Sequence, residues 1–241
     1  WVHAGGVKAM LARLTQKDTR DRIRADIERD GLNNWGRIPS WDCVRISISP
    51  HLPQHAGRTI AALAAERGRD PIDVICDYLV EDRAATRVLV TSISEDDIRE
   101  LMRSPTALVG SDGNCVATYG TVSQGLPHPR FYGTFPRVIG RYVKEHNVIP
   151  LEAAIHKMTG ATAKALNLAD RGLLRPGMRA DLALFDPDDF TDRATYADPH
   201  QYPSGERTTV IVNGTLVVEN AQHTGATPGR VLRRSADGAV S

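Results

Sequence analysis

The spacing of hydrophobic residues predicts helices over much of the chain. Ile23 and Ile27, for example, are four residues apart among charged residues, as on one face of a helix. Gly31 and Gly68 are placed to end two helices, and Ser94 is typical of a residue that caps the start of another. Besides the helix after Ser94, the expected helices cover residues 6–14, 18–30, 57–67, 70–80, 135–146 and 151–158.

Strands are indicated at fewer positions. Residues 43–48 alternate hydrophobic with polar, which is typical of a strand with one buried face, and residues 87–90 form a second candidate. Residues 107–109 (Ala-Leu-Val) form a continuous hydrophobic run between Pro105 and Gly110. Such a run predicts a strand buried on both faces, as in a parallel sheet covered by helices.

The pattern changes after Gly160. Residues 181–185 alternate like a strand, and residues 208–212 and 215–218 flank Asn213-Gly214, a preferred two-residue turn of a β-hairpin. The tail from Thr224 is rich in Gly, Arg and Ser and is expected to fray. We therefore expect an α/β domain over residues 1–170 and a small β-rich domain over residues 171–241.

Composition excludes several classes of function. The chain of 241 residues has 30 Lys and Arg against 29 Asp and Glu, so its net charge recruits neither nucleic acid nor a membrane surface. No hydrophobic stretch approaches the roughly 18 residues that span a bilayer. Cys43, Cys76 and Cys115 are scattered and odd in number, which is typical of free thiols in a reducing compartment. We expect a cytoplasmic protein.

One aspartate stands where function is often found. Asp112 lies in Gly110-Ser111-Asp112-Gly113, directly after the hydrophobic run. Asp-Gly is a common turn dipeptide, so a simple turn is one interpretation. The other is a functional carboxylate, because the long loop of residues 114–132 follows, and such loops at the carboxyl ends of strands often carry function. At the end of a barrel strand, a carboxylate faces the active site and can carry a proton between water and a leaving group.

Longer phrases around Asp112 resemble the N-acyl-D-amino-acid deacylase (D-aminoacylase) branch of the metal-dependent amidohydrolases. GSDG is followed by HPRFYGTFPR at residues 128–137, the phrase that points to this branch. DRGLLRPGMRADL at residues 170–182 and the Val-Asn-Gly hairpin are widespread among amidohydrolases. The resemblance implies the carboxyl-terminal part of a (β/α)₈ barrel, with its last strand, last helices and a helical insertion, plus part of a small β-sandwich domain. The chain departs from the family at residues 114–120, which leaves substrate specificity open.

The resemblance implies roles for four residues. Asp112 matches the general base and acid of the family, and Arg130 matches the arginine that binds the α-carboxylate of the substrate. A planar guanidinium suits that task because it meets both carboxylate oxygens; the alternative for Arg130 is a solvated loop residue. Ile93 falls where the family places a hydrophobic pocket residue, although a core position would look the same. His128 either contacts the substrate, orients the loop or merely caps it.

The metal site that the resemblance implies needs ligands that this chain does not supply. No pair of its histidines forms the HxH phrase of the family. His51 and His55 have the spacing of ligands on a helix, but Pro53 argues against a helix there. Zinc sites take at least three protein ligands as a rule. The other histidines are His3, His128, His146, His156, His200 and His223. We expect no metal ligand in this chain and zinc held by an absent amino-terminal part.

The resemblance thus implies a fragment of a hydrolase that acts when completed by the missing barrel half or a complementary chain. Its expected substrate is a small N-acyl-D-amino acid, and its products are a carboxylate and a free D-amino acid. Two alternatives remain open. One is another amidohydrolase, a cyclic amidase or an isoaspartyl dipeptidase, against which the HPRFYGTFPR phrase argues. The other is an inactive truncated product.

Overall fold

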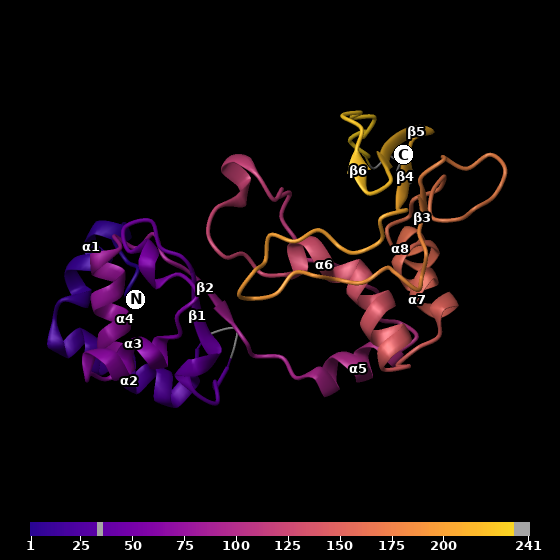
Figure 1. Cartoon of the computed structure of the whole chain (residues 1–241). Helices are drawn as coiled ribbons and strands as arrows, with labels where there is room; N and C mark the ends of the chain where they lie inside the picture. The colour runs from indigo at the N-terminus through magenta and orange to yellow at the C-terminus, as the bar shows by residue number, and fades with distance from the viewer. Residues whose placement is uncertain (33–35, 234–241) are drawn as a thin grey trace. The chain divides into compact units, whose positions relative to one another are not determined.

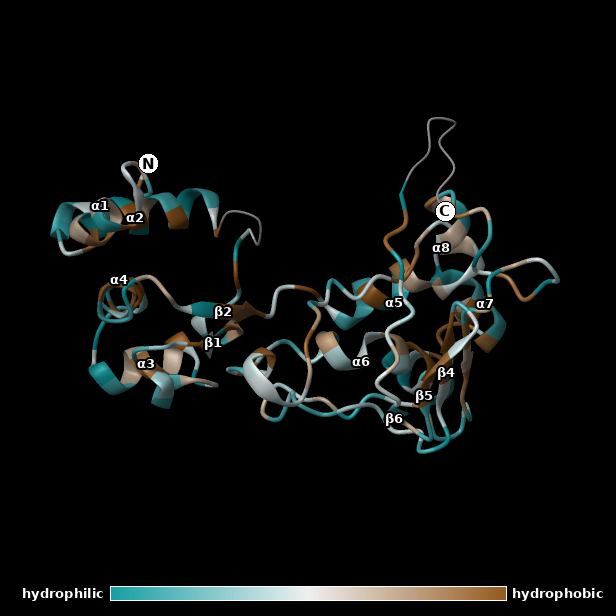
Figure 2. Cartoon of the chain, turned by 90° about the horizontal axis from the view of Figure 1, so that it is seen from above, coloured by the Kyte–Doolittle hydropathy of each residue, from teal (hydrophilic) through white to brown (hydrophobic). Residues whose placement is uncertain are grey.

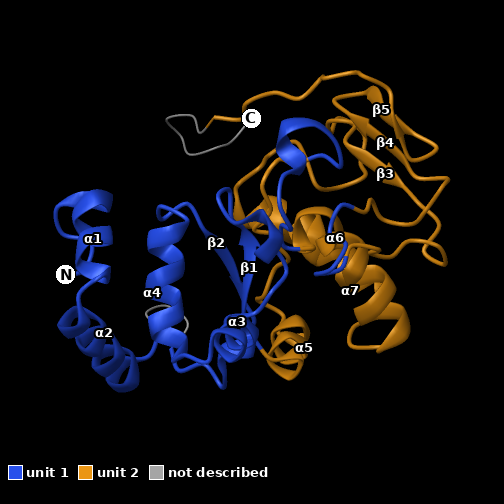
Figure 3. Ribbon diagram, turned by 60° about the vertical axis from the view of Figure 1, so that its left-hand side comes forward, with its two compact units in different colours: residues 1–93, 117–128, 195–200 blue, residues 94–116, 129–194, 201–241 orange. Residues whose placement is uncertain are grey.

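The computed structural model describes residues 1–32 and 36–233, and it divides into two compact units (Figures 1 and 3). Unit 1 comprises residues 1–93, 117–128 and 195–200. Unit 2 comprises residues 94–116, 129–194 and 201 onward. Among the described helices, none has both the length and the hydrophobicity to cross a membrane.

Unit 1 is built mainly of helices, and the start and end of each follow from its sequence. Asp70 accepts hydrogen bonds from the N–H groups of Ile72 and Asp73, so α4 begins at Pro71. Gly31 and Gly68 adopt positive φ angles of 79° and 59° where α2 and α3 end. The elements are α1 (Gly6–Leu14), α2 (Lys17–Asp30), η2 (Trp41–Cys43), β1 (Val44–Ile48), η3 (Pro53–His55), α3 (Ile60–Arg67), α4 (Pro71–Glu81), β2 (Arg87–Val90) and η4 (Gly120–Ser123).

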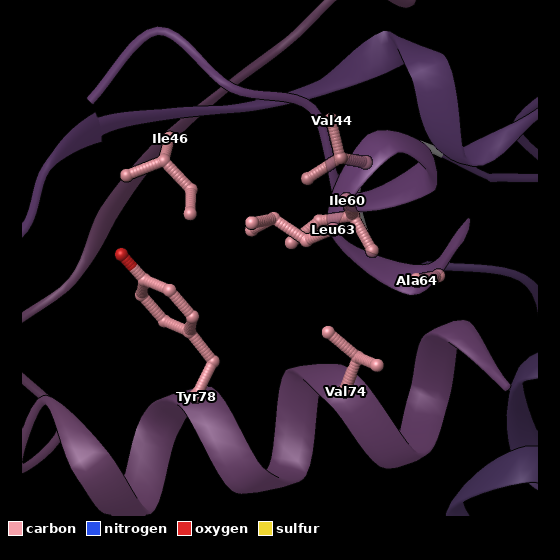
Figure 4. Close-up of a cluster of buried hydrophobic side chains, with 7 residues drawn as sticks. All are labelled: Val44, Ile46, Ile60, Leu63, Ala64, Val74 and Tyr78. Atoms are coloured by element: carbon pink, nitrogen blue, oxygen red, sulfur yellow. The ribbon is translucent and has the colours of Figure 1, made fainter. Parts of the chain in front are cut away.

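Helix α4 is the centre of unit 1 because it is buried on two sides. Val74 and Tyr78, four residues apart, point toward the side chains of β1 and α3, including Ile46 and Leu63 (Figure 4). Ile72 and Cys76, also four apart, pack with buried residues of α1. The two strands pair antiparallel, with Val44 opposite Val90.

Unit 2 combines helices with a small antiparallel sheet of order β3-β4-β5-β6. Asn213 and Gly214 have φ angles of 49° and 79°, as the predicted two-residue hairpin turn between β4 and β5 requires. Figure 2 shows how hydrophobic these two strands are. The elements are α5 (Glu95–Arg103), α6 (Arg130–Arg137), the π-helix η5 (Val138–Glu145), α7 (Leu151–Met158), α8 (Gly160–Ala165), β3 (Leu182–Leu184), β4 (Thr209–Val212), β5 (Thr215–Glu219) and β6 (Gln222–His223).

The hydrophobic core of unit 2 lies between η5 and α7. Its buried members include Ile139, Tyr142 and Ala154, and Val109 packs against them from the segment before Asp112. Thr191 and Asp192 lie very close to the helix formed by α6 and η5. A Cβ atom on Gly140 would stand 2.1 Å from Thr191 Oγ1, so this approach requires glycine there.

Two sequence predictions were wrong in this unit. Residues 107–109 form no strand, and Leu108 is 41% exposed. A strand needs a partner for its hydrogen bonds, and the described residues offer none to this run. The helix expected from Phe135 begins earlier, at Arg130, and Pro129 before it already has helical φ and ψ angles of −52° and −25°.

The division into domains 1–170 and 171–241 stays a prediction. The β-strands of unit 2 do begin after α8, as the sequence pattern indicates, but helices and sheet share one compact unit. Residues 224–233 contain no helix or strand, and the remainder of the tail, residues 234–241, lies outside the described residues.

Candidate active site

Asp112 occupies an irregular segment of unit 2 that runs from the end of α5. Its φ angle is 46°, in the left-handed region that Asp and Asn tolerate better than most residues. The N–H of Gly113 donates a hydrogen bond to Ser111 Oγ at 3.2 Å, which closes a local turn around Asp112. The turn interpretation therefore describes the backbone at Asp112, while a functional role for its carboxylate stays a prediction.

The partner of the Asp112 carboxylate is Arg130, the first residue of α6. Its Nη2 atom lies 2.7 Å from Asp112 Oδ2, and its Nε–H donates to the main-chain oxygen of Asp112 at 3.1 Å. One guanidinium thus binds both the side chain and the backbone of a residue 18 positions earlier. The structure brings these two predicted site residues together.

The Asp112–Arg130 pair is open to solvent. The Asp112 side chain is 88% exposed and that of Arg130 is 39% exposed. Ion pairs of this kind contribute about 1 kcal/mol or less to stability, because water screens them. The carboxylate of a dissolved molecule can therefore reach the Arg130 guanidinium and compete with Asp112 for it.

The other two predicted site residues belong to unit 1. The Nε2 atom of His128 lies 3.1 Å from the hydroxyl oxygen of Tyr196, and the two rings meet edge to face with centroids 5.1 Å apart. This contact joins the loop that carries His128 to the segment that carries Tyr196. Ile93 is 68% exposed, so the core alternative for that residue is wrong. Contact of either side chain with a substrate stays a prediction.

The residues that the structure describes do not fit a zinc site. Over residues 1–32 and 36–233, no three His, Cys, Asp or Glu side chains are grouped to hold a metal ion. His51 and His55 do not act as a ligand pair: Nδ1 of His51 lies 3.3 Å from Oδ1 of the buried Asp82, and the ring of His55 lies against Tyr78.

A polar network that the sequence did not reveal connects the helices on either side of this site. Arg137 of α6 lies 2.9 Å from Asp192 and 3.5 Å from Glu95, the first residue of α5. The hydroxyl of Tyr142 donates to Glu95 Oε2 at 2.9 Å. Burial raises the pKa of Glu95, but the Tyr142 hydrogen bond and the charges of Arg141 and Arg137 outweigh it and hold that pKa below its usual value.

No local sequence pattern predicts these contacts. Glu95 and Arg137 are 42 positions apart, and Tyr196 follows His128 by 68 positions. Each residue by itself is indistinguishable from a solvated surface residue. A record of which positions vary together among relatives is the signal that finds such pairs.

Comparison with known proteins gives the site a context. The sequence profile of the amidohydrolase family matches residues 1–218. A D-aminoacylase of Alcaligenes xylosoxydans xylosoxydans is 38% identical over 184 residues, which are 76% of this chain and 35% of that protein. An N-acyl-D-glutamate deacylase of the same organism is 36% identical over 202 residues, or 83% of this chain and 38% of that protein. The chain spans little more than a third of the length of these relatives.

A solved structure is similar to this chain in both sequence and fold. The crystal structure of N-acyl-D-glutamate deacylase from Bordetella bronchiseptica, complexed with zinc and a phosphonate inhibitor, matches with a TM-score of 0.63 and 34% identity. The match covers 75% of this chain and 35% of that one. The expected fold class is thereby confirmed: the chain is α/β and corresponds to part of a larger amidohydrolase structure.

The lowered pKa of Glu95 predicts an acid-sensitive contribution to stability. A carboxylate whose pKa is lower in the folded than in the unfolded state stabilises above its unfolded pKa of about 4.3 and loses that effect as pH falls through the folded value. We expect Glu95→Gln to lower the free energy of unfolding at pH 7 by less than about 1 kcal/mol, since Glu95 is partly exposed. The difference from the unsubstituted chain should shrink at pH 3.

Urea unfolding at the two pH values measures this difference. Glu100→Gln is the matched control, because Glu100 lies on the same helix with its side chain 81% exposed. A deficit of Glu95→Gln that is equal at both pH values, or no larger than that of the control at pH 7, would contradict the account.

Proposed function

The chain belongs to the amidohydrolase family, and from that membership we propose that the complete protein hydrolyses the amide bond of N-acyl-D-amino acids. The products are a carboxylate and a free D-amino acid. The observation that carries the proposal is the contact between Asp112 and Arg130, since it places a proton acceptor beside a carboxylate-binding group. The D-aminoacylase and N-acyl-D-glutamate deacylase among the relatives support the substrate class.

Arg130 is proposed to bind the α-carboxylate of the substrate. Its present partner is itself a carboxylate, at 2.7 Å, so the guanidinium already makes the kind of bond that the substrate needs. The pair is exposed and weak, and a substrate carboxylate can take the place of Asp112. Binding of the substrate then frees the Asp112 carboxylate beside the bound amide.

Asp112 is proposed to carry the proton of the reaction. Hydrolysis of an amide needs a base that removes a proton from the attacking water and an acid that gives a proton to the leaving nitrogen. One carboxylate performs both tasks when it is within hydrogen-bond reach of both atoms, and such catalysis contributes about 100-fold to 10,000-fold to a rate. The product amine leaves neutral, and the carboxylate is regenerated.

Zinc dependence is proposed for the complete protein, with every ligand outside this chain. The described residues do not fit a zinc site, and the solved relative from Bordetella bronchiseptica contains zinc. The proposed partner of this chain is therefore the remainder of the barrel or a complementary chain.

His128 and Ile93 are proposed to line the substrate pocket. A cytoplasmic location is also proposed, and the free state of all three cysteines supports it.

Metal removal tests the proposed zinc site. We expect the complete protein to lose activity with a chelator and regain it with zinc, and this chain expressed by itself to hold no stoichiometric zinc. Metal analysis by mass spectrometry of both proteins provides the measurement. Tight zinc binding by this chain would refute the proposal that all zinc ligands lie outside it. Activity of the complete protein that a chelator does not lower would refute zinc dependence.

Substitution of Asp112 tests the proposed reaction. In the complete protein, Asp112→Asn should lower kcat for N-acetyl-D-amino acids by about 100-fold or more, because an amide cannot accept the proton. Asn tolerates the left-handed backbone at this position, so the fold is preserved. Initial rates over a panel of N-acetyl-D-methionine, N-acetyl-D-leucine and N-acetyl-D-glutamate give the measurement.

Asp96→Asn is the matched control, since Asp96 is 92% exposed on α5. If Asp112→Asn behaves like this control, Asp112 has no part in the mechanism. Hydrolysis of cyclic amides or isoaspartyl dipeptides alone would instead assign the protein to another amidohydrolase class.

A further inference from the structure

A buried lysine holds the segment that leads to Asp112. Lys157, near the end of α7, is only 7% exposed. Its Nζ donates hydrogen bonds to the main-chain oxygens of Ser104 and of Ala107, the latter at 2.8 Å. Burial of an ammonium is costly unless its donors are satisfied, so a lysine at a core position indicates a specific task.

Both carbonyl groups belong to one turn. The N–H of Ala107 donates to the oxygen of Ser104 at 3.3 Å, which closes a four-residue turn directly after α5. Lys157 therefore binds the two ends of this turn with one ammonium. The end of a helix carries partial negative charge, which favours a cation there.

The same segment has one further anchor before Asp112. Val109 packs against the core cluster that contains residues of η5 and α7. Within the described part of the chain, residues 107–112 pair with no strand, so sheet hydrogen bonds do not fix their course. The attachments at Ser104, Ala107 and Val109 all precede Asp112 by at most eight positions.

We infer that Lys157 is a positioning residue for Asp112: its bonds to Ser104 and Ala107 fix the backbone that presents the carboxylate. This inference rests on the role proposed above for Asp112. Arg130 lies on α6, outside the turn that Lys157 binds, so these two bonds act on the segment of Asp112 and not on the helix of Arg130. Loss of Lys157 should therefore affect proton transfer more than substrate binding.

Steady-state kinetics of the complete protein test the inference with Lys157→Met. We expect kcat for the best N-acetyl-D-amino acid of the panel to fall about 100-fold, since misplacement of a catalytic group by an ångström costs that much. KM should change by less than about 3-fold, in keeping with a retained Arg130. Lys157→Arg should recover part of the rate, because a guanidinium also donates to two carbonyls.

Lys164→Met is the matched control, since Lys164 is an exposed lysine on α8. It should leave kcat and KM unchanged. A Lys157→Met variant that raises KM and lowers kcat equally, or that matches the control, would overturn the inference.

A double substitution separates positioning from general damage. In an Asp112→Asn background, Lys157→Met should lower the residual rate by less than about 3-fold, because the group that it positions is already gone. A residue that only stabilises the fold would cause the same loss in both backgrounds. That outcome would refute the positioning role.

Limited proteolysis gives a readout that needs no activity. Arg103 precedes Ser104, whose carbonyl Lys157 binds, and its side chain is 54% exposed. In the complete protein, Lys157→Met should make trypsin cleave after Arg103 about 10-fold faster, while other sites keep their rates. Unchanged cleavage there relative to Lys164→Met would overturn the inference. Should the protein hydrolyse no N-acyl-D-amino acid, the proposed function fails, and the cleavage rate alone decides whether Lys157 anchors the turn.

Discussion

The contact between Asp112 and Arg130 is the interaction on which the proposed chemistry depends, and it is too weak to create its own geometry. Both side chains face water, and such a pair adds little to stability. The two segments must therefore be brought together by their surroundings. The structure of unit 2 supplies these surroundings on both sides of the pair, with Lys157 behind the segment of Asp112 and the Arg137 network behind α6.

A weak and exposed pair is also the one that suits a substrate. A guanidinium that is buried with a permanent carboxylate partner would exclude a ligand, because breaking such a buried ion pair costs about 3–5 kcal/mol. In the proposed reaction, Arg130 exchanges one carboxylate for another of the same chemistry. That proposed exchange links substrate binding to release of the proton acceptor, so one event prepares both groups for the reaction.

Much of the fold could be predicted because its signals are local. The bounds of α1, α7 and β2 follow from hydrophobic spacing, and the hairpin at Asn213-Gly214 follows from turn chemistry. The strand expected at residues 107–109 failed because a strand depends on a partner that no local pattern supplies. The early start of α6 was missed because Gly133 and Pro136 weaken the helical signal, although Gly133 is needed where Asp192 comes close.

The candidate site was predicted only in part, for the same reason. Phrases of sequence identified Asp112 and Arg130, and the structure added that they touch. The polar contacts near them could not be found, since Lys157 and Glu95 bind partners 42 to 53 positions away. Such contacts depend on tertiary packing, which the order of residues along the chain does not display.

The most direct test of this account is whether Arg130 recognises the carboxylate of the substrate. In the complete protein, kcat/KM should be compared for an N-acetyl-D-amino acid and for its neutral carboxamide, with Arg130→Met and the exposed control Arg207→Met alongside. We predict that the unsubstituted protein and the control prefer the acid by about 100-fold, because the carboxamide lacks the negative charge that strengthens hydrogen bonds to the guanidinium. The Arg130→Met variant should lose most of this preference. An equal preference for the acid in the Arg130→Met variant would contradict the account.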